Sequence, residues 1–375
     1  MAGKKRDKPK ARQLEGFKFF KALAGMLEPL HEAGCQRDRA GNRTLHMDQY
    51  MTLLIMYMFN PICSSLRALQ EASELKKVQR VLGVPRASLG SLSEAARVFD
   101  SDLLVGVIGD LAAKLRPVRD DARLADFRQI ITLVDGSWLP ALTTMTWALF
   151  RHDTHKAVKA HVHFEVLKGV PTAAAITDAN TSEACQLRTM LEPGHLYVLD
   201  RGYFDYGLYQ AVLDADSSFV CRARANAVLR ETVEERELSR PALDAGVVRD
   251  VVGLLGCAAG KNNVPRPLRL VEITCTPHRK RSGKTGRGGP EQGETILLIT
   301  DRLDLPAEVI ALLYQHRWAV EIFFRFFKHV LGCRHLLSHC ENGIELETYA
   351  AIIACLLIAL WTGRKPTLST HRIVT

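Results

Sequence analysis

The feature that most constrains the fold is a change of pattern near residue 129, where a helical stretch gives way to short apolar runs. The run QIITLVDGSWLP, residues 129–140, reads as a buried strand that ends at Asp135 and a glycine turn. The run HLYVLD ends in Asp200 in the same way. The elements that follow the first strand are predicted as strands at 161–167 and 171–177, a helix at 181–193, a strand at 195–200, a helix at 205–215 and a strand at 218–225. This order predicts a mixed α/β fold, with helices flanking a mixed β-sheet.

The rest of the chain divides around this series. The N-terminal part contains only helical patterns and is a candidate DNA-binding domain. Two of its helices, on either side of a Gly/Pro break after residue 82, fit a DNA-binding pair and a plain helical bundle equally well. The predicted divisions are a flexible basic arm at 1–13, an all-helical domain at 14–118, the α/β domain at 129–225 plus 293–361, a β-rich insertion at 226–292 and a basic tail at 362–375.

Positive charge points to a class of partner. The net charge is +9 at pH 7 and the pI is about 9.1, which favours a polyanion. The charge is concentrated in residues 1–12 and in a Gly-rich stretch at 278–289. Such runs are usually solvated loops, and contact with nucleic-acid phosphates is the alternative.

Cysteine usage and apolar runs indicate the compartment. The nine cysteines are scattered, and no apolar segment follows the basic N-terminus. This pattern indicates reduced thiols in the cytoplasm rather than a disulfide framework. The apolar run at 349–361 is too short to span a bilayer and is predicted as a buried helix, so no membrane partner is expected.

One segment near the C-terminal end, YQHRWAVEIFFRFFK at 314–328, combines polar side chains with a heavy aromatic load. At about 100° per residue, a single α-helix places four of these polar residues on one narrow stripe, namely Tyr314, Arg317, Glu321 and Lys328. The aromatic residues cover most of the remaining surface, as in a helix packed into a core. A salt-bridged surface face is the simpler interpretation of such a stripe.

Three carboxylates are candidates for one site, namely Asp135, Asp200 and Glu321. Acids at strand ends are available to a cleft because the hydrogen bonds of the strand stop there. Carboxylates brought together repel one another unless a cation lies among them, and Mg²⁺ or Mn²⁺ prefers oxygen ligands. Two such ions can activate a water or a 3′-hydroxyl and stabilise the leaving oxygen of a phosphodiester. Taken singly, each acid also fits a cap, a turn or a surface position.

The motifs around these residues resemble those of a known family. LVDGSW at Asp135, VLDRGYF at Asp200 and Tyr-x2-Arg-x3-Glu-x6-Lys at 314–328 resemble the bacterial insertion-sequence DDE transposases of the insertion-sequence-four family. The resemblance runs from about residue 129 to residue 361. It implies a ribonuclease-H-like catalytic domain with a β-rich insertion between the second Asp and the Glu. It also implies two Mg²⁺ ions, replaceable by Mn²⁺, held by the three acids.

The same resemblance implies a DNA transposase, which hydrolyses phosphodiesters at the ends of an insertion sequence in a metal-dependent step and then transfers strands. The implied partners are double-stranded DNA, as terminal inverted repeats and target, and a second subunit in a homodimer on DNA. The implied location is the bacterial cytoplasm, at the nucleoid. Tyr314, Arg317 and Lys328 would hold phosphates or a flipped base at the transposon end. Weaker candidates for phosphate contact are Arg201, Arg222 and Arg224.

Other functions stay open on the sequence alone. A catalytically inactive, transposase-derived DNA-binding protein is the first alternative, and degenerate acids would have favoured it. A hydrolase with two carboxylates, such as a glycosidase, is the second, and it predicts an acidic or aromatic cleft rather than cations around the acids. A purely structural, salt-bridged helix at 314–328 is the third.

Overall fold

The structure is a computed structural model, and it describes most of the chain. It covers residues 23–375 except for 24, 35–37, 39–40, 61, 119–121, 125–126, 141–144, 146, 149, 153–154, 225–226, 257–263, 275–294 and 334. The predicted basic arm at 1–13 and the basic stretch at 278–289 therefore lie outside the described residues.

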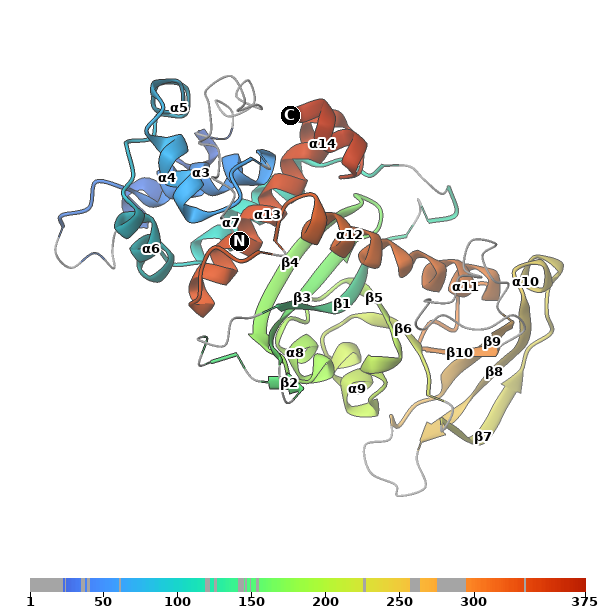
Figure 1. Cartoon of the computed structure of the whole chain (residues 1–375). Helices are drawn as coiled ribbons and strands as arrows, with labels where there is room; N and C mark the ends of the chain where they lie inside the picture. The colour runs from blue at the N-terminus through green and yellow to red at the C-terminus, as the bar shows by residue number, and fades with distance from the viewer. Residues whose placement is uncertain are drawn as a thin grey trace, which may run out of the picture.

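Five strands form the centre of the sheet, in the spatial order β4-β3-β1-β5-β6 (Figure 1). β1 pairs antiparallel with β3, and β3 pairs antiparallel with β4. On its other side β1 pairs in parallel with β5, which pairs in parallel with β6. The bounds are β1 Ile130–Pro140, β3 His155–Glu165, β4 Val170–Asp178, β5 His195–Leu199 and β6 Ser218–Arg222. An antiparallel trio followed by two parallel strands confirms the mixed, ribonuclease-H-like sheet.

The sheet continues beyond β6. β10 pairs antiparallel with β6, and β9, β8 and β7 follow in turn, all antiparallel. A short β2 pairs with the start of β3. The bounds are β2 Phe150–His152, β7 Val228–Glu235, β8 Val247–Gly256, β9 Leu268–Thr274 and β10 Thr295–Thr300, with helix α10 at Arg240–Asp244. The strands predicted as an insertion thus extend the same sheet, and the proposed domain boundaries stay predictions.

Both faces of the central strands are buried, which explains their continuous apolar runs. In β5, Leu196 and Val198 belong to the core under the C-terminal helices, whereas Tyr197 and Leu199 belong to a second core. The second core is covered by α8 (Glu183–Thr189) and α9 (Tyr206–Asp214) (Figure 1). Successive side chains of a strand point to opposite faces, so one short run supplies both cores.

The opposite face carries the helices that end the chain. The polar segment predicted as one helix is two helices, α11 (Ala307–His316) and α12 (Trp318–His329). The break falls at Arg317, whose N–H bonds to the carbonyl of Tyr314 at 3.0 Å, so an i→i−3 bond interrupts the α-helical ladder. The tail predicted after residue 362 contains α14 (Leu368–Val374), because Thr367 and Thr370 form a capping box.

α13 (Glu341–Thr362) is the central helix of the molecule and confirms the predicted buried helix. It packs against β4 and against helices of the N-terminal part (Figure 1). By length and composition it could cross a membrane, but 89% of its apolar window is buried inside the protein. The N-terminal helices are α2 Leu30–Ala33, α3 Met47–Phe59, α4 Leu66–Ser73, α5 Lys76–Leu82, α6 Leu89–Val98 and α7 Leu103–Lys114, followed by a 3₁₀ turn at Ala122–Leu124.

Candidate active site

The two aspartates predicted as metal ligands lie at the same level of adjacent strands. The parallel pairing of β1 with β5 ends at Val134 opposite Leu199, and Asp135 and Asp200 are the next residues. Asp200 follows the end of β5, as predicted. Asp135 does not end β1, because the antiparallel pairing with β3 continues to Pro140. The ladder between β1 and β5 therefore stops at the two acids, and we call this place the acidic edge.

Burial and the charges of neighbouring acidic and basic side chains act on the carboxyl of Asp135. Its Oδ1 accepts the backbone N–H of Gly136 at 2.9 Å. Burial raises the pKa of Asp135 to about 7; the charge of Arg317 opposes this rise, and the carboxylates of Glu183 and Asp200 add to it. A carboxyl that is held partly protonated near neutral pH gains from the arrival of a cation.

Asp200 is the better compensated of the two acids. The hydroxyl of Tyr314 donates to its Oδ1 at 2.9 Å. Burial acts to raise the pKa of Asp200, but the charge of Arg317 and hydrogen bonds from the Arg201 N–H and Tyr314 outweigh it, so the pKa is lowered. The two neighbouring carboxyls are thus held in different protonation states at the same pH, an arrangement found at catalytic sites.

Arg317 connects the third predicted acid to the other two. Its Nη2 donates to Glu321 Oε1 at 2.7 Å, and its charge acts on both Asp135 and Asp200. Glu321 therefore reaches the acidic edge through a guanidinium rather than directly. Among the described residues no group of three or more His, Cys, Asp or Glu side chains has the geometry of a metal site. The predicted role of Glu321 as a metal ligand stays a prediction.

Lys328 ties α12 to the strand that carries Asp135. Its Nζ donates to Ser137 Oγ at 2.7 Å and to the carbonyl oxygen of Trp138 at 2.8 Å. The break at Arg317 has not scattered the predicted stripe, since its side chains contact Asp200, Glu321 and the end of β1. The polar stripe therefore faces the sheet, not only solvent.

The three arginines predicted as weaker phosphate contacts lie close to Asp200 in the chain or in space. Arg201 is exposed and directly follows Asp200. Arg222, at the end of β6, is partly buried, and its charge acts on Asp200. Arg224 is exposed, with its guanidinium 5.9 Å from the centre of the Phe204 ring. Two of the three are thus open to a polyanion.

Sequence reasoning missed Glu183, the first residue of α8. A Cβ added to Gly136 would lie 2.9 Å from Glu183 Oε1, and one added to Gly202 would lie 2.8 Å from Oε2. The carboxylate thus fills a slot that exists because both residues lack side chains. The sequence held a signal for it, since a glycine follows Asp135 by one residue and Asp200 by two.

Two further side chains surround this carboxylate. Lys159 is buried on β3, with its Nζ 3.6 Å from Glu183 Oε1, and it donates to the carbonyl of Thr181 at 3.0 Å. The Tyr203 hydroxyl is buried and has no hydrogen-bond partner among the described residues. Burial, followed by the charges of Glu183, Asp135 and Asp200, raises the pKa of Tyr203. This hydroxyl therefore stays protonated, as a buried donor without an acceptor among the described residues.

These residues fit a divalent cation. Two carboxylates stand side by side where a strand ladder ends, and burial disfavours the charged form of one of them. Carboxylate oxygens are the ligands that Mg²⁺ and Mn²⁺ prefer. The two aspartates therefore offer the kind of oxygen ligand that a hard cation prefers.

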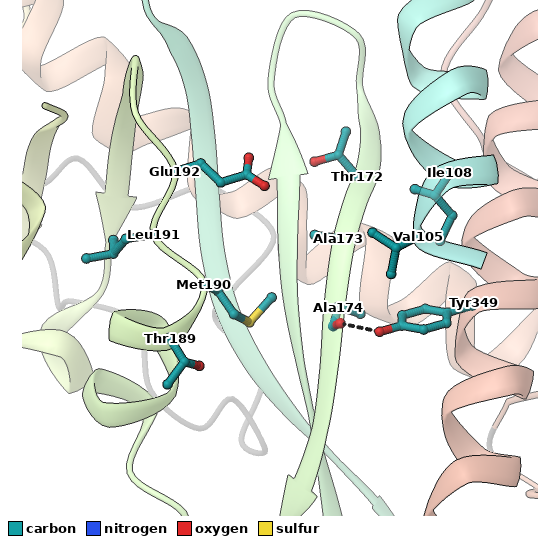
Figure 2. A pocket seen from close by; sticks show the side chains of 10 residues that line it. All are labelled: Val105, Ile108, Thr172, Ala173, Ala174, Thr189, Met190, Leu191, Glu192 and Tyr349. Atoms are coloured by element: carbon teal, nitrogen blue, oxygen red, sulfur yellow. Dashed lines mark hydrogen bonds between the residues drawn. The ribbon is translucent and has the colours of Figure 1, made fainter. Parts of the chain in front are cut away.

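A cavity of about 310 Å³ lies elsewhere, between α7, β4 and the segment after α8 (Figure 2). Val105, Ile108 and Ala174 give it an apolar wall, and on the same side the Tyr349 hydroxyl donates to the Ala174 carbonyl at 3.2 Å. Glu192 is the acid among its lining residues, and the acids of the acidic edge do not line it. We therefore place the chemistry at the acidic edge and not in this cavity.

Comparison with known proteins identifies relatives. Residues 126–357 match the family described as the transposase DDE domain. A putative transposase of Sinorhizobium fredii is 31% identical over 234 residues, which are 62% of this chain and 61% of that protein. A probable transposase for an insertion sequence element of Geobacillus stearothermophilus is 23% identical over 282 residues, 74% of this chain and 68% of that protein. A solved piggyBac transposase synaptic complex with hairpin DNA aligns at a TM-score of 0.42 and 10% identity, covering 99% of this chain and 82% of that chain.

Proposed function

The chain belongs to the transposase DDE domain family, and we propose that it is a DNA transposase that cleaves and joins DNA at the ends of an insertion sequence. The observation that carries this proposal is the acidic edge, where Asp135 and Asp200 lie side by side and Tyr314 and Arg317 act on them. Family membership supports the class of reaction, and the edge supplies side chains suited to it.

In this proposal Asp135, Asp200 and Glu321 hold two Mg²⁺ ions, or Mn²⁺ in their place. Bound there, the cations would activate the attacking oxygen and neutralise charge on the phosphodiester. Glu321 joins the two aspartates by releasing its ion pair with Arg317. The guanidinium is then free to make a charge-assisted pair with a DNA phosphate.

The polar stripe and the exposed arginines would hold the DNA. Tyr314 and Arg317 already contact or act on Asp200, so a DNA strand bound by these two residues would lie next to the acidic edge. Lys328 presents a cation at the end of β1. Exposed Arg201 and Arg224 extend the positive surface beside Asp200. Arg222 completes this proposed set from β6.

The proposed reaction has two steps. A water first attacks the phosphodiester at each end of the element, the bond to the 3′ oxygen breaks, and a 3′-hydroxyl is released. That hydroxyl then attacks the opposite strand or target DNA, displacing a second 3′ oxygen. We infer terminal inverted repeats and target DNA as partners, a homodimer on the DNA, and action at the bacterial nucleoid.

A plasmid assay tests the proposal. The purified full chain is incubated with Mg²⁺ and a supercoiled plasmid that carries the inverted repeats flanking this reading frame. We expect nicking by the wild type and none by Asp135→Ala, Asp200→Ala or Glu321→Ala. Glu231→Ala, an exposed change on β7, is the matched control and should nick normally. Any acid whose removal leaves nicking intact does not belong to the site.

The inactive alternative has a clear outcome in the same assay. A protein that shifts the terminal DNA in a gel but leaves the plasmid supercoiled at every Mg²⁺ concentration is a DNA-binding descendant, not a transposase. The glycosidase alternative is disfavoured by the cations of the polar stripe around the acids.

A further inference from the structure

We propose that Glu183 is a positioning residue that fixes the spacing between Asp135 and Asp200, and that Lys159 holds it in place. This inference rests on the proposed function, because the two aspartates belong to the proposed site. Glu183 itself touches neither DNA nor a cation in this role. It acts through the backbone that follows each aspartate, and it comes from a different element, the start of α8.

The Glu183 carboxylate lies between the two backbone segments that follow the aspartates. A Cβ at Gly136 would lie 2.9 Å from Glu183 Oε1, and a Cβ at Gly202 would lie 2.8 Å from Oε2. Each oxygen thus packs against one segment, at a position where glycine leaves room for it. Because both contacts belong to one planar group, the carboxylate limits how closely the two segments approach each other.

The backbone beside Glu183 also holds the aspartate side chains. The N–H of Gly136 donates to Asp135 Oδ1 at 2.9 Å. The backbone N–H of Arg201 makes one of the hydrogen bonds that lower the pKa of Asp200. A shift of either segment would therefore move the carboxyl group that it holds.

Glu183 meets β1 on the face opposite to the Asp135 side chain. Gly136 follows Asp135 within β1, and successive side chains of a strand point to opposite faces. The Glu183 carboxylate lies against the position that a side chain at Gly136 would take. It therefore supports the strand from behind and leaves the space in front of Asp135 open.

Lys159 ties Glu183 to the sheet. It is 6% exposed and lies on β3, which pairs with β1 on one side and with β4 on the other. Its Nζ lies 3.6 Å from Glu183 Oε1 and donates to the carbonyl of Thr181 at 3.0 Å. The lysine thus joins the start of α8 at two points to an inner strand, so the position of Glu183 follows that of the sheet.

Hydrogen–deuterium exchange of the metal-free, full-length protein, followed by mass spectrometry, tests the proposal without requiring turnover. Glu183→Ala removes the carboxylate, and we expect exchange to rise about tenfold in the peptides that contain Asp135 and Asp200. The peptides around Asp250 should exchange as in the wild type. Glu183→Gln keeps the shape and can still accept from Lys159, so it should restore most of the protection.

Gly202→Ala tests the contact itself. Its methyl group would displace Glu183 Oε2, so alone it should raise exchange near both aspartates, as Glu183→Ala does. The methyl meets no other described residue within 4 Å, so it should add nothing in the Glu183→Ala background. Glu165→Gln is the matched control, because it changes another Lys–Glu pair of β3, at 3.1 Å from Lys168, and should leave exchange near the aspartates unchanged.

Nicking kinetics give a second measurement. We expect Glu183→Ala to lower kcat about 100-fold, because a small misplacement of the groups at a reaction site is costly. The KM for DNA should stay close to that of the wild type, because Glu183 contacts no DNA in this role. Glu183→Gln should recover most of kcat, whereas a ligand to a cation would lose its function in both variants.

The outcomes separate this inference from the proposed function. Wild-type exchange in Glu183→Ala, a change near only one aspartate, or additive effects with Gly202→Ala overturns the inference, even if the protein cleaves DNA. An unchanged kcat in Glu183→Ala, or a loss in Glu183→Gln that equals it, does the same. If Glu183→Ala does not fold, Gly202→Ala alone decides. The expected exchange pattern in a wild type that never nicks DNA supports the positioning role and overturns the transposase activity.

Discussion

Two aspartates of the same sheet differ in how their negative charge is compensated. Asp250 on β8 is buried and meets Arg269 of β9 in a two-pronged pair, with Nε–Oδ1 at 2.8 Å and Nη2–Oδ2 at 2.6 Å. Arg269 also donates to the carbonyl oxygens of Arg302 and Leu305. Asp135 on β1 accepts one backbone hydrogen bond and has a raised pKa.

The two regions differ in whether a buried charge is neutralised within the fold. Within β8 and β9 each charge has a partner, so the pair is internally neutral and needs nothing from solvent. At the acidic edge burial raises the pKa of Asp135, the charge of Arg317 opposes this rise, and two acids add to it. The guanidinium of Arg317 also serves Glu321. We interpret this imbalance as a binding site for positive charge.

The largest expected effect comes from removing one partner of the Asp250–Arg269 pair. Asp250→Ala leaves Arg269 buried and uncompensated, and we expect it to lower the free energy of unfolding by about 3–5 kcal/mol. Urea unfolding followed by circular dichroism measures this loss. The double variant Asp250→Leu with Arg269→Met should recover most of it, because no lone charge remains. A loss below about 1 kcal/mol would show that the pair is not internally balanced in the way described.

The next effect is a gain in stability rather than a loss. The pKa of Asp135 in the folded protein is about 7, above its ordinary value. The stability gained from its protonation is therefore fully present below pH 4 and is lost as the pH rises through 7. Asp135→Asn should make the metal-free protein more stable than wild type at pH 8, by at most about 4 kcal/mol, and not at pH 4.

Thermal unfolding in EDTA at the two pH values measures this gain. Asp250→Asn is the matched control, and at pH 8 it should lose stability because it weakens a satisfied pair. Equal stability of Asp135→Asn and wild type at pH 8 would contradict the raised pKa of Asp135.

A smaller effect concerns Asp200. Tyr314→Phe removes the 2.9 Å hydrogen bond to its carboxylate, which should cost about 1 kcal/mol at pH 7 and raise the pKa of Asp200. Because that pKa is lowered in the folded protein, the stability it brings is present above the ordinary value and disappears in acid. The cost of Tyr314→Phe should therefore shrink as the pH falls below about 4. A cost that is independent of pH would mean that the Tyr314 hydroxyl does not act through the charge of Asp200.

The smallest effect separates packing from DNA contact. Lys328→Met removes two hydrogen bonds to the end of β1, and we expect a loss of about 1 kcal/mol. If Lys328 also contacts a phosphate, the salt dependence of DNA binding should fall by about one unit of slope. Arg325→Met, an exposed change on the same helix, is the control. If the two variants show the same salt dependence, Lys328 makes no phosphate contact that Arg325 does not also make.

The sequence predicted those parts of the molecule whose signals are local. The apolar run at 195–200 became β5, because buried strands need continuous apolar residues. Asp200 was predicted as the last residue of a strand, and it directly follows β5. The position of Asp135 within β1 was not predicted, because its extension depends on pairing with β3, which no local pattern reveals.

Glu183 shows why the remainder was hidden. In the sequence it is an acid in the first turn of a helix, where the helix dipole alone accounts for it. Its approach to Gly136 and Gly202 requires three segments to meet in space. The break at Arg317 is similar, since continuous helical patterning runs through 314–328 and the interruption shows only in its backbone hydrogen bonds. The extension of the sheet to β7 also depends on long-range pairing.

The placement of α13 has a consequence for how the protein is made in the cell. Both β4 and the N-terminal helices pack against this helix, which begins only at Glu341 of 375 residues. While the ribosome is still translating, β4 and the N-terminal helices lack this shared surface, and the apolar sides that pack against it stay open to chaperones and proteases. A prematurely terminated message would therefore yield a polypeptide for degradation rather than a folded protein.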